Sequence, residues 1–192
     1  MPPRRPRRPL PPRRFDHRKP AARKVHPLLL RANQLFSNGK YMEAANLYEK
    51  LAKGALDRGL PRAPLLFLQA GKSLLATGRL KRGVVLAQRG LGLLADQNRW
   101  RELHQFGYRT VNVLNELGYE KEAQNMEEWL KARLPEKEEA AIREHQAAAP
   151  NAKPDFPVNC SACGARVHPD EVVMIDTTTA ECSFCGSIIK AR

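Results

Sequence analysis

The four cysteines of the chain stand in two CxxCG sequences, and their side chains could together hold one metal ion. Cysteines at positions i and i+3 of a tight turn grip an ion from two sides, and two such turns complete a tetrahedral thiolate shell. Since no export signal precedes them, metal ligation in a reducing compartment is favoured over disulfide bonding. The predicted ligands are Cys160, Cys163, Cys182 and Cys185.

A shell of four thiolates leaves no open position for water or substrate, so the sequence predicts one structural zinc ion. Iron is the alternative, as in a rubredoxin-like electron carrier, because the spacing of the cysteines does not separate the two metals. His168 could substitute as a ligand, but the complete thiolate set favours its interpretation as an exposed loop histidine.

Two stretches rich in β-branched residues lie between the cysteine pairs, and a third follows them. Residues 171–176 and 177–181 predict a hairpin, and residues 187–190 predict a third strand. Gly164 and Gly186 follow the two pairs, where glycine can adopt the positive φ that turns backbone N–H groups toward the thiolates. The segment resembles a zinc ribbon, and it is too short to fold without its metal.

The last 35 residues carry three basic and four acidic side chains, and a zinc ion with four thiolates adds a formal charge of −2. Phe184 is the one aromatic residue at the tip of a cysteine turn. An anionic surface with so little stacking area suits protein contact better than nucleic acid.

Basic charge is concentrated at the N-terminus. Residues 1–24 hold ten Arg or Lys against Asp16, a balance of +9 within the net charge of +13 of the whole chain. With seven prolines and few apolar side chains, this arm is expected to be disordered. Arginines in such an arm neutralise phosphates, which predicts salt-sensitive contact with RNA or DNA. The residues expected to make it are Arg4, Arg5, Arg7, Arg8, Arg13 and Arg14.

Helical periodicity follows the arm and is interrupted by glycines at a nearly constant interval. Gly39, Gly78 and Gly118 are 39 and 40 residues apart, and a small residue follows each of them five positions later. A recurrence of this length is typical of stacked helix pairs. The first unit, ANQLFSNGKYMEAANLYEKL, resembles a tetratricopeptide repeat, and the next two units keep fewer positions of that pattern. The predicted fold is an all-α helical-repeat solenoid of three helix pairs, with a small β zinc ribbon.

The resemblance implies a peptide-binding groove along the first helix of each pair. Amide and basic side chains in such grooves hold carboxylates, and arginine can do so through two parallel hydrogen bonds. No Asp or Glu occurs between Asp57 and Asp96, which favours an acidic ligand. Solvated surface side chains are the alternative interpretation. The pattern assigns to the groove Asn33, Phe36, Lys72, Tyr108, Arg109, Asn112 and Asn115.

Nothing in the sequence indicates catalysis, since it contains no nucleophile elbow, phosphate loop or paired-carboxylate motif. We therefore expect a non-catalytic adaptor that binds a partner protein or acidic peptide through the groove and uses the ribbon as a second interaction module. An RNA- or DNA-associated factor acting through the basic arm is the alternative.

The apolar stretches are too short to cross a bilayer, so we expect a cytoplasmic protein without membrane contact. Prolines before the ribbon predict that it moves relative to the helices. The expected organisation is an arm at residues 1–24, repeats at 25–134, a helix and proline-containing linker at 135–157, and the ribbon at 158–192.

Overall fold

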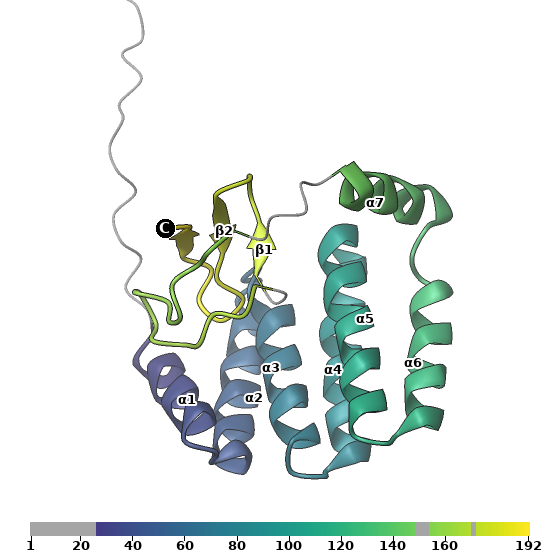
Figure 1. Cartoon of the computed structure of the whole chain (residues 1–192). Coiled ribbons are helices and arrows are strands. Elements are labelled where there is room, and N and C mark those ends of the chain that lie inside the picture. The colour runs from purple at the N-terminus through teal and green to yellow at the C-terminus, as the bar shows by residue number, and fades with distance from the viewer. Residues whose placement is uncertain (1–25, 149–153, 170–171) are drawn as a thin grey trace, which may run out of the picture.

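The computed structural model describes residues 26–148, 154–169 and 172–192, so the predicted basic arm lies outside the described residues (Figure 1). Seven helices precede a small sheet in the part of the chain that it describes. The helices are α1 (Pro27–Ser37), α2 (Tyr41–Asp57), α3 (Ala63–Leu75), α4 (Leu80–Asp96), α5 (Trp100–Glu116), α6 (Glu120–Lys131) and α7 (Glu136–Ala148). They form the helical body of the molecule.

The three evenly spaced glycines end helices in the same way. Gly39, Gly78 and Gly118 all have positive φ, between 72° and 80°. After the first of them, the N–H of Lys40 donates to the carbonyl oxygen of Leu35, and equivalent bonds follow the other two glycines. This is the Schellman arrangement, which satisfies the last carbonyl groups of a helix and reverses the chain. The predicted helix breaks are confirmed.

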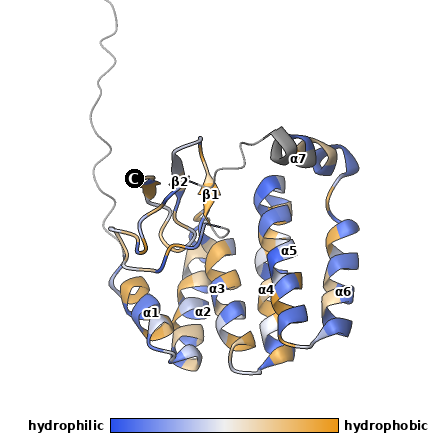
Figure 2. Cartoon of the chain, in the orientation of Figure 1, coloured by the Kyte–Doolittle hydropathy of each residue, from blue (hydrophilic) through white to orange (hydrophobic). Residues whose placement is uncertain are grey.

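Consecutive helices lie side by side across the body, as Figure 1 shows, and α7 crosses the end of α5. Helix α3 is the most enclosed, with 11 of its 13 residues buried. The later helices carry hydrophilic outer faces (Figure 2), and α5 and α6 each bury only one side. An amphipathic helix of this kind gains its stability by covering the apolar side of a neighbour.

Helices α3 and α4 approach each other closely because glycines stand at their contact. A Cβ atom on Gly71 would lie 2.9 Å from the carbonyl oxygen of Gly83, and one on Gly90 would lie 2.7 Å from that of Pro64. The sequence leaves open whether interior glycines here cost stability or permit close contact. The structure shows close contact at these positions.

The C-terminal segment, residues 154–192 without 170–171, is named here the cysteine module. Its strands β1 (Val173–Met174), β2 (Thr179–Glu181) and β3 (Ile188–Lys190) form an antiparallel sheet in the order β1-β2-β3. Ala180 pairs with Met174 on one side and with Ile189 on the other. The predicted hairpin and third strand are confirmed.

The cysteine module packs against the helical body, which differs from the predicted mobile tether. Phe156, in the predicted linker, is buried, and it shares one hydrophobic cluster with all four cysteines and with side chains of α1, α2 and α3. The N–H of Arg192 donates to the carbonyl oxygen of Asp155, which holds the module's two ends together. The prolines before the module predicted movement. They carry no information on this packing, because it depends on apolar surface of helices that are distant in the sequence.

Among the described residues, no helix is long and apolar enough to span a bilayer.

Candidate metal centre and the adjoining helix face

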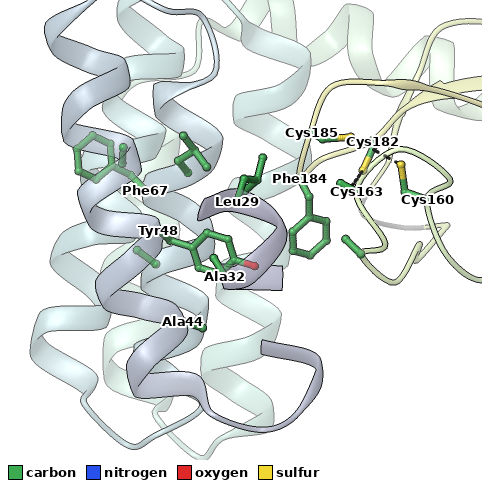
Figure 3. Packing of buried hydrophobic residues seen from close by; sticks show 14 of the residues in the cluster. Leu29, Ala32, Ala44, Tyr48, Phe67, Cys160, Cys163, Cys182, Phe184 and Cys185 are labelled. Carbon is green, nitrogen blue, oxygen red and sulfur yellow. Dashed lines mark hydrogen bonds between the residues drawn. The ribbon is translucent and has the colours of Figure 1, made fainter. Parts of the chain in front are cut away.

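The four cysteine sulfur atoms converge in the interior of the cysteine module (Figure 3). All four lie within 4.8 Å of one another, and the closest pairs are Cys160 with Cys185 at 3.6 Å and Cys163 with Cys182 at 3.8 Å. These separations are too long for disulfide bonds. A tetrahedral ion with metal–sulfur bonds of about 2.3 Å places its ligands about 3.8 Å apart. The buried thiol group therefore has the dimensions to hold one metal ion.

Two short turns place the cysteines. In the first turn the N–H of Gly164 donates to the carbonyl oxygen of Cys160, and in the second that of Gly186 donates to Cys182. Both glycines have positive φ, 69° and 66°, as the two CxxCG sequences predict. A Cβ at Gly186 would lie 2.7 Å from a carboxylate oxygen of Glu181 and 2.9 Å from the guanidinium of Arg62, but both are ends of flexible side chains that can move. The positive φ is therefore the stronger reason for glycine here.

The thiols influence one another's ionisation strongly. Hydrogen bonds from Cys163 and then from Cys182 and Cys185 lower the pKa of Cys160, whereas the bond shared with Cys160 raises the pKa of Cys163. One thiolate is thus stabilised by its neighbours while the next resists ionisation. A cation placed among the sulfur atoms removes this conflict, because it attracts every thiolate at once.

A buried amide joins the centre to the helical body. Asn33 of α1 is only 3% exposed, and its side-chain NH₂ donates to the carbonyl oxygen of Cys163 over 3.2 Å. The hydroxyl of Tyr48, on α2, donates to the amide oxygen of Asn33 over 2.8 Å. Burial first, and then the nearby Cys163 and Cys182, raise the pKa of Tyr48, so the hydroxyl keeps its proton and remains a donor.

We expect Asn33→Ala to destabilise the chain by about 2 to 4 kcal/mol, because it leaves a buried hydroxyl and a buried carbonyl without their partner. Denaturant unfolding of the metal-loaded chain measures the loss, and hydrogen exchange shows whether the cysteine module opens. Gln34→Ala is the matched control, since Gln34 is exposed on the same helix. Equal stability of the two variants would show that the amide bridge contributes nothing.

Other contacts extend the seam between module and helices. The rings of Phe36 and Phe184 lie 6.5 Å apart, and the amino group of Lys72 lies 5.5 Å above the ring of Phe36. At the other end of the seam, the side-chain amide of Gln105 on α5 donates to the carbonyl oxygen of Val172 over 2.8 Å. The module therefore lies against the parts of α1 and α3 that the sequence assigned to a peptide groove.

The predicted groove residues fall into two groups. Asn33, Phe36 and Lys72 lie at the module, as described above. Tyr108, Arg109 and Asn112 lie together on α5, where they line an open depression of about 430 Å³ with His104, Gln105, Val113 and Glu116. Asn115 is exposed on α5 and is not among the residues that line this depression. The predicted arginines of the N-terminal arm lie outside the described residues.

No family model, curated protein or solved structure matches the chain.

Three residues with a part in the seam escaped prediction. Gln105 and Arg166 look like ordinary surface residues in the sequence, and His168 was expected to be an exposed loop histidine. In the structure His168 is half-buried and lines a pocket with Arg166. The absence of acidic residues between Asp57 and Asp96 was the one signal that favoured an acidic contact on the helices.

Proposed function

We propose that the chain is a non-catalytic adaptor in which three tetratricopeptide-like helix pairs hold an acidic segment of a partner protein and a docked zinc ribbon completes the binding face. The observation that carries the proposal is the depression on α5. Three of the residues that the repeat pattern assigned to a groove, Tyr108, Arg109 and Asn112, meet there. This depression is beside the part of the face that the cysteine module covers.

Charge and hydrogen-bonding capacity both favour an acidic peptide. Lys72 and Arg109 line a second, smaller depression between α3 and α5, so cationic groups continue from the module to the α5 face. Gln69 lines the same depression, and its amide oxygen is buried without a hydrogen-bond partner among the described residues. A peptide with carboxylate side chains is the complement of these cations.

Zinc is the metal that we propose for the centre. Four thiolates with no further ligand among the described residues fit a closed structural site. When bound, the ion would fix the two turns and so hold the module against α1. Metal analysis of the purified chain distinguishes zinc from iron, and a visible absorption spectrum would favour iron and an electron carrier.

Reversing the charge of Arg109 tests the peptide groove. We expect Arg109→Glu to weaken binding of a glutamate-rich peptide by tenfold or more, because it replaces an attractive charge with a repulsive one. Fluorescence anisotropy with the zinc-loaded full chain measures the affinity. Lys121→Glu changes the net charge equally at an exposed position on α6 and should retain binding. Identical affinities of the two variants would contradict the groove.

The basic arm supports a second candidate function, association with RNA or DNA, because residues 1–24 carry a balance of +9. A pull-down with the full chain and with residues 25–192, each with and without nuclease, separates the two functions. A partner protein that both forms retain after nuclease treatment supports the adaptor. Loss of the partner with the arm or with nuclease supports the nucleic-acid factor.

A further inference from the structure

A pocket of about 300 Å³ opens along the seam between the helical body and the cysteine module. We name it the seam pocket. Half of its lining residues come from α1, α2 and α3, and half come from the module. The lining residues are Asn33, Phe36, Ser37, Tyr41, Lys72, Asn159, Ala165, Arg166, His168 and Phe184.

The polar groups of the seam pocket are mainly donors and cations. Lys72 enters from the helical side, and Arg166 and His168 enter from the module. None of the described residues that line the pocket is acidic. In the sequence of residues 154–192 as a whole, five acidic side chains stand against three basic ones. Asn159 adds an exposed amide, and it is paired with Arg166 through an isolated β-bridge that sets the two side by side. Two cationic side chains, one from α3 and one from the module, and a histidine are thus gathered around one pocket.

We propose that the seam pocket binds a small oxyanion, the phosphate or carboxylate group of a ligand. Arginine presents parallel N–H groups that match two oxygens of such a group, and lysine adds a point charge from the opposite wall. The volume of the pocket equals that of roughly ten water molecules, taking about 30 Å³ for each, which is ample for a phosphate and its nearest waters. The pocket shares no lining residue with the α5 depression, and Lys72 also lines the smaller depression between α3 and α5.

Binding of an oxyanion in the seam pocket is expected to be coupled to the docking of the cysteine module. A ligand held by Lys72 on one side and by Arg166 and His168 on the other stabilises the docked arrangement of module and helices. By thermodynamic reciprocity, docking must then raise the affinity of the pocket for the ligand. An oxyanion is therefore expected to slow the loss of metal from the chain.

The test is a titration of the zinc-loaded full chain with inorganic phosphate, followed by two-dimensional NMR at constant ionic strength. We expect saturable shifts in the amides of Phe36, Asn159, Arg166 and His168. Arg166→Gln should weaken phosphate binding by about tenfold, because it removes a charge-assisted hydrogen-bonding group. Lys121→Gln, an equal loss of charge on exposed α6, should leave binding unchanged. Acetate, a glutamate-rich peptide and a phosphoserine peptide then show which source of oxyanion binds best.

A second measurement follows zinc transfer from the chain to a coloured chelator, with phosphate and without. Phosphate should slow the transfer from the natural chain and have no such effect in Arg166→Gln. The alternative is that these cations only balance the thiolate charge, in which case the variant loses zinc faster by the same factor in both buffers. That result, or shifts that fail to saturate or spread to α6, would overturn the proposal.

Discussion

Removing the metal is expected to unfold the cysteine module while most of the helical signal remains. Metal binding contributes roughly 10 to 16 kcal/mol of apparent stability to small zinc modules, and the strands of this one are only two or three residues long. The cluster of buried residues around α5 and α6 contains no cysteine and so keeps its contacts. Helix α1 is expected to loosen, because its buried side faces the module. Circular dichroism and hydrogen exchange, before and after chelation, measure these effects.

The control for metal removal lies inside the first cysteine turn. Cys163→Ser removes a ligand and should reproduce the effect of the chelator without any chelator present. Ser161→Ala alters an exposed residue of the same turn and should have no effect. An uncovered α1 should also bind a hydrophobic dye. If chelation left the amides of 172–192 as protected as before, the centre would not be the source of the module's stability.

Adding one methyl group at Gly90 is expected to destabilise the chain by about 1 to 3 kcal/mol, the usual range for overpacking a well-packed contact. The new Cβ would lie 2.7 Å from the backbone oxygen of Pro64 and 2.9 Å from Leu68, and a backbone atom cannot rotate away. The helices α3 and α4 must therefore move apart. Urea unfolding of Gly90→Ala measures the change.

Gly92 offers a matched control two residues further along α4. A Cβ there would meet no atom within 4 Å, so Gly92→Ala should stabilise the helix by about 0.5 to 1 kcal/mol through helix propensity alone. The two substitutions are chemically identical and differ only in the approach of α3. If Gly90→Ala were as stable as Gly92→Ala, close packing of the two helices would be excluded.

Local rules account for the parts of the fold that could be predicted. The positions of Gly39, Gly78 and Gly118 predicted the ends of three helices, because a left-handed residue after a helix is a property of a few neighbouring residues. The CxxCG turns and the three strands are equally local. The convergence of the cysteines follows from coordination chemistry, which restricts four thiolates to one small volume.

The docking of the module could not be predicted in this way. Asn33 looks like any polar residue of an amphipathic helix, and only the fold shows that it meets the carbonyl oxygen of Cys163. The repeat pattern did place Asn33 and Phe36 on a ligand-facing side, and the charge of α3 and α4 favoured an acidic occupant. In the structure the cysteine module of the same chain packs against Asn33 and Phe36, which the repeat pattern did not predict. The acidic ligand stays a prediction.

The bond between Asn33 and Cys163 also has a consequence for biosynthesis. The two residues are 130 positions apart, and at 5 to 20 residues per second a ribosome needs roughly 7 to 26 s to make the intervening chain. During that interval α2 can pack on α1 and Tyr48 can bond the amide oxygen of Asn33, but the NH₂ group of Asn33 lacks its partner on Cys163. Helices α1 to α6 can assemble in the meantime, but the side of α1 that faces the module stays open until both cysteine turns have been translated. If the module needs its metal to fold, a shortage of that metal would lengthen the time for which the newly synthesised chain exposes apolar surface and depends on chaperones.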